Sequence, residues 1–240
     1  MNLIKNIIRD SLGSIYYNGY KRFCKRGNRC LIYHAFGSNI KHDTYGISIN
    51  IKKFKDHIKY LSNTFKITNL NDFSEELSVS LSIDDGYKDT IEAIDILTEY
   101  KFPFSLFITS SNINKKGYLS KHDIANISQN EYSMIGTHGA NHIKLGMIDK
   151  TNQYIELKNS KDIIEDIIAK EVSSLSYPHG SYNLDTINIA KDLGYQWAAC
   201  SMKGFNGVKT NRYLLNRSEI ISTDTSRDLL KKIEGHYDYY

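Results

Sequence analysis

The stretch Leu81-Ser82-Ile83-Asp84-Asp85-Gly86-Tyr87 sets the pattern of this chain. An apolar run over residues 79–83 ends abruptly in two carboxylates and a glycine. Apolar side chains at helical spacing then follow as far as Tyr100. A short β-prone run, a tight turn and a helix in this order form one strand-helix unit. Such units build parallel sheets.

The same alternation continues along the chain. Further runs rich in β-branched and aromatic residues predict strands at 31–36, 65–70, 104–109, 133–137, 174–177, 196–202 and 213–220. Helical patterns lie between most of them, at 51–62, 156–169 and 184–193. This order predicts an α/β fold with a parallel sheet, either open or closed into a barrel. Its chemistry is expected at the carboxyl ends of the strands.

Composition narrows the class of protein. The chain has 240 residues, 40% hydrophobic and 24% charged, which suffices for one globular domain and excludes disordered, collagen-like and coiled-coil proteins. No apolar run approaches the roughly 20 residues of a membrane-spanning helix. The three cysteines, Cys24, Cys30 and Cys200, contain no C-x-x-C pair. They therefore indicate neither a disulfide framework nor a thiolate zinc site, and they fit a reducing cytoplasm.

Positive charge is concentrated at the start of the chain. Residues 1–29 hold seven Lys or Arg and one acid, a charge of +6, which leaves −2 on the remainder. Such a segment can contact nucleic acid, anionic lipid or an anionic substrate, or simply face solvent. The rest of the chain does not resemble a nucleic-acid binder, and the segment lacks the continuous apolar core of a signal peptide. We expect a basic arm at 1–29, one domain at 30–240 and a cytoplasmic location. Contact of the arm with the inner membrane or with a phosphate-bearing substrate stays open.

Asp84 and Asp85 are the first candidates for chemistry. Adjacent carboxylates repel each other, so their place at a strand end favours a cation that neutralises one and leaves the other as a base. The alternative is that one of them merely caps the following helix.

His138 and His142 are the second candidates. They follow the predicted strand at 133–137, and one helical turn would present both rings on one face. Imidazole and carboxylate ligands together favour zinc or another late first-row ion, and two His with one Asp leave a coordination position open for water. The alternative is a pair of surface histidines at chance spacing.

Three further strand ends carry polar groups. Residues 176–180 read Ser-Tyr-Pro-His-Gly, a turn whose N–H groups can point at a ligand. His34 ends the first strand of the body, where a lone His is more often structural than catalytic. Arg217 lies in a strand-like run, where it either pairs with a carboxylate in a barrel mouth or faces solvent.

The order and spacing of these motifs resemble the polysaccharide deacetylase family, the carbohydrate esterase family 4-like group with the NodB homology domain. The resemblance extends from about residue 30 to about residue 220. It implies a distorted (β/α) barrel of about seven parallel strands. The family's Asp-Asp-Gly strand end implies Asp84 as the general base and Asp85 as a metal ligand. Its His-x-x-x-His motif implies His138 and His142 as the other two ligands.

The resemblance implies further roles. The turn at 176–180 is similar to a family motif that would place the backbone N–H of His179 in the oxyanion hole. Many members protonate the leaving amine with a C-terminal Leu-x-His motif, which is absent here. A subgroup similar to the deacetylases of biofilm poly-N-acetylglucosamine carries this His near the N-terminus instead, and Tyr33-His34 looks like that arrangement. His34 is therefore the expected general acid.

This chain also departs from the family pattern. Ser176 stands where many members carry Arg, so we assign Arg217 the task of orienting Asp84 and lowering its pKa. Gly139 replaces a usual Ser or Thr, and His179 replaces a common Tyr. These changes concern the fit of the substrate more than the metal. Residues beside the motifs are expected to bind substrate, namely Tyr87, Tyr177 and Pro178.

The function implied is removal of an N-acetyl group from an amino sugar, with one divalent metal ion, zinc in our expectation. The substrate would be a polysaccharide or a nucleotide- or lipid-linked glycan precursor. Two alternatives stay open. One is a carbohydrate-binding protein that keeps the fold without catalysis, against which the presence of Asp84 beside the metal ligands argues. The other is a metal-dependent esterase or phosphoesterase, because the same activated water serves several electrophiles.

Overall fold

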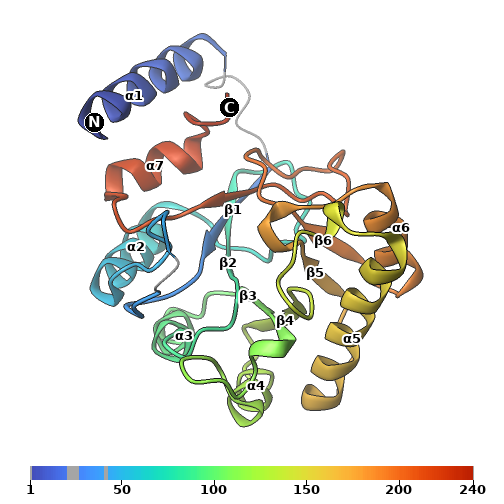
Figure 1. The fold of residues 1–240 in the computed structure, drawn as a ribbon. Helices are drawn as coiled ribbons and strands as arrows, with labels where there is room; N and C mark the ends of the chain where they lie inside the picture. The colour runs from blue at the N-terminus through green and yellow to red at the C-terminus, as the bar shows by residue number, and fades with distance from the viewer. Residues whose placement is uncertain (1, 21–26, 41–42, 240) are drawn as a thin grey trace.

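The structure is a computed structural model that describes residues 2–20, 27–40 and 43–239. Its centre is a seven-stranded sheet in the order β6-β5-β4-β3-β2-β1-β7, in which every strand pairing is parallel (Figure 1). The strands are β1 Asn28–Tyr33, β2 Ser78–Ile83, β3 Phe104–Ile108, β4 Ser133–Thr137, β5 Ser174–Ser176, β6 Trp197–Ala199 and β7 Arg217–Glu219.

The sheet is nearly closed into a barrel. Its edge strands β6 and β7 meet just before β7 begins, where Ala199 and Leu215 form a parallel bridge and the N–H of Cys200 donates to the Leu215 carbonyl at 2.9 Å. Pairing is uneven, because β1 and β2 pair over six residues whereas β4 and β5 share one pair. The prediction of a distorted barrel of about seven parallel strands is confirmed.

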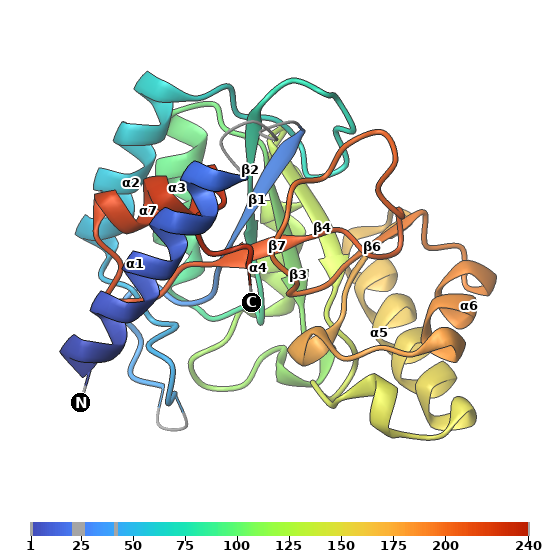
Figure 2. The same ribbon diagram turned by 90° about the horizontal axis from the view of Figure 1, so that it is seen from above.

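Helices surround the barrel (Figures 1 and 2). They are α1 Asn2–Gly19, α2 Ile51–Thr64, α3 Thr90–Glu99, α4 Lys121–Ile127, α5 Lys150–Ile168, α6 Leu184–Asp192 and α7 Ser226–Glu234, with short 3-10 turns η2 Ser110–Asn112, η3 Leu145–Met147 and η4 Pro178–Gly180. Side-chain caps start five of them, with Asn50, Ser120, Asp149, Asn183 and Thr225 as the N-cap residues. Helix α2 shows why the sequence folds this way: its buried residues Phe54, His57, Ile58 and Leu61 recur at helical spacing and so line one face.

Alternate strand residues divide between two apolar clusters. Leu106 and Ile108 of β3 belong to the larger cluster, whereas Phe107 joins a smaller one with Trp197 of β6. The Phe107 and Trp197 rings meet edge to face at 5.8 Å although three strand steps separate β3 from β6. They can touch only across the inside of the barrel, so the smaller cluster fills its interior. Trp197 is 3% exposed and so packs fully within this cluster.

Several elements differ from the prediction. Residues 65–70 form no strand, and Ile67 makes a single bridge to Val79. Residues 65–70 and β3 compete for the same side of β2. From Leu81 onward β3 occupies that side, so only the bridge at Val79 is left for residues 65–70. Helices α1, α4 and α7 were not anticipated. Among the described residues, no helix combines the length and apolar character needed to cross a membrane.

Helix α1 lies within the predicted basic arm and packs against α7 (Figures 1 and 2). Asp10 accepts hydrogen bonds from Lys231 at 2.8 Å and from the Tyr237 hydroxyl at 2.9 Å. The approach is close at Gly13, where a Cβ would lie 2.9 Å from the carbonyl oxygen of His236. The division at residue 30 stays a prediction.

Not all of the charges counted with the arm lie on the described part of α1. Arg29 lies inside β1, where its buried guanidinium binds both carboxylate oxygens of Asp238 at 2.9 and 2.8 Å. Lys21, Arg22, Lys25 and Arg26 lie outside the described residues, as does Cys24, and the side chain of Lys5 is likewise not described.

Candidate active site

The polar residues singled out in the sequence gather at one rim of the barrel. Asp84 follows β2 directly, His138 follows β4, and His34 follows β1, while Ser176 is the last residue of β5. Parallel strands present their carboxyl ends on the same side, so four loops separate in sequence converge there. Arg217 reaches the same rim from β7.

Asp85, His138 and His142 form a group with the geometry of a metal site. Their ligand atoms all lie within 4.8 Å of one another. Asp85 Oδ1 is 3.3 Å from His142 Nε2 and 3.5 Å from His138 Nε2. The same Oδ1 is buried and has no hydrogen-bond partner among the described residues. A buried carboxylate oxygen facing two imidazole nitrogens fits a divalent cation, because the ion would supply the missing partner.

Both histidines present Nε2 to this point. Nδ1 of His138 donates to the Ser176 carbonyl at 2.8 Å, which fixes the tautomer and leaves Nε2 free to bind. Burial and the nearby His138 ring lower the pKa of His142 to about 4, although Asp85 opposes the shift. A neutral imidazole is the form that a metal requires.

Asp84 lies beside this group and is held by Arg217. The guanidinium donates to both oxygens of Asp84, at 2.8 and 2.9 Å, and also to the hydroxyls of Ser82 and Ser176 at 3.1 and 2.6 Å. The Ser176 hydroxyl in turn donates to Asp84 Oδ2 at 3.0 Å. The structure thus places Arg217 where the sequence interpretation put it, in contact with Asp84.

This network keeps Asp84 ionised in a buried position. Asp84 is 2% exposed and Arg217 is 1% exposed. Burial raises the pKa of Asp84, but the charges of Arg217, His138 and His34 outweigh it and hold the pKa well below its ordinary value. Burial without the guanidinium would favour the protonated acid.

Backbone strain is concentrated in the three loops of the site. Asp85, His142 and His179 all have left-handed backbones, with φ of 74°, 55° and 57°. Each such residue costs roughly 1–3 kcal/mol and persists only where its surroundings hold it. Gly139 is also left-handed, at φ 69°, and a Cβ there would lie 3.1 Å from Pro178 Cγ. The left-handed backbone and this close contact both favour glycine at a position where Ser or Thr is usual in the family.

His34 lies next to the network at the end of β1. Its side chain is 13% exposed, its Nε2 lies 3.9 Å from Glu219 Oε1, and its Nδ1 is buried with no hydrogen-bond partner among the described residues. The loop that follows is tied to the start of α3, because Asp89 Oδ2 accepts from the N–H groups of Phe36 and Ser38 at 2.8 Å each.

The turn after β5 is closely joined to the metal-site loop. His179 is exposed, and its Nε2 lies 3.2 Å from the His142 carbonyl oxygen while the two rings are 4.4 Å apart. The placement of its N–H in an oxyanion hole stays a prediction. Pro178 is buried beneath Gly139.

The two tyrosines expected to bind substrate are both buried. Tyr177 has 0% exposure, packs in the larger core cluster and lies 5.3 Å from the Tyr182 ring. The main core therefore encloses the Tyr177 ring, and its assignment to substrate binding stays a prediction. Tyr87 is 6% exposed and stacks on Tyr118, with the ring centroids 4.9 Å apart.

Sequence reasoning missed several residues that build the site. Glu156 of α5, which is 7% exposed, accepts hydrogen bonds from the N–H groups of Ala140 and Asn141, between the two histidines. Glu219 faces His34 and Asp89 anchors the loop after it. Single acidic residues in or beside ordinary helices and strands carry no spacing signal that would have marked them.

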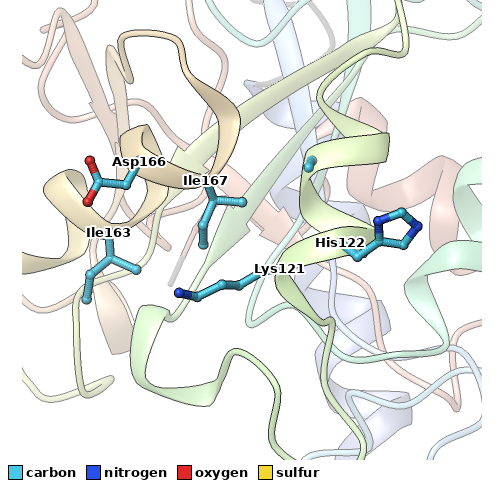
Figure 3. Close-up of a pocket in the computed structure, with 6 residues that line it drawn as sticks. Lys121, His122, Ile163, Asp166 and Ile167 are labelled. Atoms are coloured by element: carbon cyan, nitrogen blue, oxygen red, sulfur yellow. The ribbon is translucent and has the colours of Figure 1, made fainter.

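The structure also has a hollow elsewhere. Figure 3 shows it between α4 and α5, with Ile163, Asp166 and Ile167 on one side and Lys121 and His122 on the other. It contains none of the residues of the barrel rim, and its charged groups are one lysine and one aspartate.

Comparisons with known proteins agree with this geometry. The family model for polysaccharide deacetylase matches residues 73–198, which include Asp84, Asp85, His138 and His142 but neither His34 nor Arg217. YxkH of Bacillus subtilis (strain 168), whose name assigns it to the polysaccharide deacetylases, is 26% identical over 203 residues. The alignment covers 79% of this chain and 70% of that protein.

Solved structures share the fold. The polysaccharide deacetylase BA0330 from Bacillus anthracis has a TM-score of 0.76 at 23% identity, covering 86% of this chain and 68% of that one. The Streptococcus pyogenes deacetylase PplD, solved with acetate, has a TM-score of 0.76 at 19% identity, covering 87% and 98%. IcaB from Ammonifex degensii has a TM-score of 0.75 at 14% identity, covering 87% and 97%.

Proposed function

We propose, since this chain belongs to the polysaccharide deacetylase family, that it is a metal-dependent hydrolase that removes the N-acetyl group of an amino sugar. The observation that carries this proposal is the convergence of Asp85, His138 and His142 on one point, with the ionised Asp84 beside it. A protein that only binds carbohydrate has no use for a second carboxylate kept charged next to a metal site.

Asp85, His138 and His142 would hold the metal. Two imidazoles and one carboxylate suit zinc and leave a coordination position open. When bound, a divalent ion at such a site makes water acidic and polarises the acetyl carbonyl.

Asp84 would accept the proton of the attacking water. A carboxylate offers about four lone-pair positions, and Arg217 and Ser176 occupy three of them. The paired guanidinium makes Asp84 a weak base, so its main contribution is a fixed orientation with one lone pair still available.

Two further groups would complete the reaction. His34 would donate a proton to the departing sugar amine, because it follows β1 at the same rim of the barrel as Asp84. The N–H of His179 would stabilise the oxyanion, because its left-handed turn lies directly against the His142 loop.

The substrate we propose is a polysaccharide or a nucleotide- or lipid-linked glycan precursor handled in the cytoplasm. Cys30 and Cys200 are buried and free, which suits a reducing compartment. We further propose that the N-terminal region contacts the inner membrane surface. Ile8, Leu12 and Ile15 recur at helical spacing on α1 and are 53%, 48% and 70% exposed, and the first 29 residues carry a charge of +6.

The test combines metal binding with acetate release. Asp84→Asn is expected to bind about one zinc per chain yet lose at least about 100-fold in turnover, because it keeps the ligands and loses the base. His138→Ala should lose both the metal and the activity. Zinc content is measured on purified protein, and acetate is measured on N-acetylated sugars and their nucleotide and lipid conjugates. Full turnover by Asp84→Asn would contradict the role given to Asp84.

A further inference from the structure

Glu156 is a buried carboxylate that touches no ligand yet contacts the loop joining two of them. It lies on α5, seven residues into the helix, and is 7% exposed. Its Oε2 accepts from the N–H groups of Ala140 and Asn141 at 3.1 and 2.9 Å, and its Oε1 accepts from the Asn141 side-chain amide at 2.5 Å. These three hydrogen bonds give both oxygens of the buried carboxyl group a donor.

These contacts fall within the three-residue span between His138 and His142. The rest of the span is bonded to neutral partners. The N–H groups of Ser110 and Ser111 donate to the carbonyls of Gly139 and Ala140 at 3.3 and 2.9 Å, and the Ser160 hydroxyl donates to Gly139 at 3.0 Å. Glu156 is the charged member of this set of described contacts.

The loop needs such support because its backbone is strained. Gly139 and His142 both have left-handed backbones, and His142 directly follows the amide that Glu156 binds. Two adjacent N–H groups aimed at one oxygen fix the orientation of both peptide planes. The direction of the His142 ring, and so the position of Nε2 relative to Asp85, depends on those planes.

We propose that Glu156 is a positioning residue that sets the geometry of the metal site by holding the 139–141 loop. The proposal rests on the proposed function, since it takes Asp85, His138 and His142 as the ligands. Glu156 acts through the backbone and not by coordination. Residues that orient metal ligands from the next layer typically change metal affinity 10- to 100-fold when they are replaced.

The test compares Glu156→Gln with Glu165→Gln in the full-length protein. Glu165 is a matched control because it lies on the same helix and its Oε1 accepts from the Val172 N–H at 2.8 Å and from Lys161 at 2.6 Å, away from the ligands. Zinc dissociation constants are measured on stripped protein by competition with a chelating dye. The absorption spectrum of the cobalt-loaded protein reports the coordination geometry, and thermal melting of the stripped protein reports stability.

Glu156→Gln should raise the zinc dissociation constant about 10-fold and shift the cobalt bands, because the amide nitrogen of Gln cannot accept from Asn141. Glu165→Gln should leave both unchanged. Asn141→Ala removes only the side-chain contact with Glu156, so it should change zinc affinity and the cobalt bands less. This variant still tests the proposal if Glu156→Gln fails to fold. Equal zinc affinity and cobalt spectra in all variants and wild type would overturn the proposal. Failure of the wild type to bind zinc would instead refute the metal site itself.

Discussion

At the scale of single residues, the decisive pair is Asp84 with Arg217. A bidentate guanidinium fits both oxygens of a carboxylate, whereas lysine would supply one point charge. The pair is buried from water, so each charge depends on the other for its solvation. Removing one partner of such a pair leaves an uncompensated charge in the interior.

Arg217→Gln is therefore expected to destabilise the protein by about 3–5 kcal/mol, because it leaves Asp84 buried and unpaired. The free energy of unfolding in urea measures this. Adding Asp84→Asn to the same chain should recover part of the loss, because the buried charge then disappears. Wild-type stability in Arg217→Gln, or no recovery in the double variant, would contradict this account of the pair.

At the scale of elements, helix α2 carries a buried histidine, His57, that has no part in the proposed chemistry. His57 is 1% exposed, its Nδ1 lies 3.4 Å from the Tyr33 hydroxyl, and its Nε2 has no hydrogen-bond partner among the described residues. Burial lowers the pKa of His57 from 6.5 to about 4, and Asp224 opposes this only in part. The folded protein thus keeps His57 neutral where the unfolded chain would protonate it.

The consequence is a loss of stability in mild acid. Above pH 6.5 both states hold His57 neutral, and as the pH falls toward 4 only the unfolded state gains the proton. The free energy of unfolding should therefore fall by up to about 3 kcal/mol over this interval. His57→Gln should reduce the fall, whereas His122→Gln, at an exposed position of α4, should not. Urea denaturation at pH 7 and pH 4.5 compares the wild type with the two variants. An equal loss of unfolding free energy in all three proteins would argue against His57 as the cause.

The same scale shows what could be read from the sequence. Asp84-Asp85 and His138 were identifiable because each follows a β-prone run at once, and parallel strands bring such ends together. Residues 65–70 have the composition of a strand, but β3 takes the place beside β2, which no local pattern reveals. Glu156 lies in a helix of ordinary composition, and its role depends on a loop 15 residues away. Such contacts form only in the folded chain, so the spacing of residues along the sequence does not reveal them.

At the scale of the whole molecule, α1 is held in place by α7 while its apolar face stays uncovered. The contacts of Asp10 with Lys231 and Tyr237 fix the helix, and Ile8, Leu12 and Ile15 point away from them. A fixed helix with an exposed apolar stripe, in a segment whose sequence carries net positive charge, is suited to lie in the headgroup layer of an anionic membrane.

Wild-type protein is therefore expected to sediment with vesicles that contain phosphatidylglycerol, and less with phosphatidylcholine alone, with binding weakened by salt. Replacing Leu12 and Ile15 together by Gln should reduce the bound fraction several-fold. Met147→Gln is the matched control, because Met147 is 80% exposed and lies on η3. Equal sedimentation of the variant and wild type would show that α1 is not the contact.

The closure of the barrel also has a consequence for the order of events during synthesis. Asp84 and Arg217 are separated by 133 positions, and the edge strands meet through the Ala199–Leu215 bridge just before Arg217. A nascent chain that has emerged through β6 already holds Asp85, His138 and His142 but has no counter-ion for Asp84. The cluster of Asp85, His138 and His142 can therefore form before Asp84 gains its counter-ion, which arrives with the last strand of the barrel to leave the ribosome.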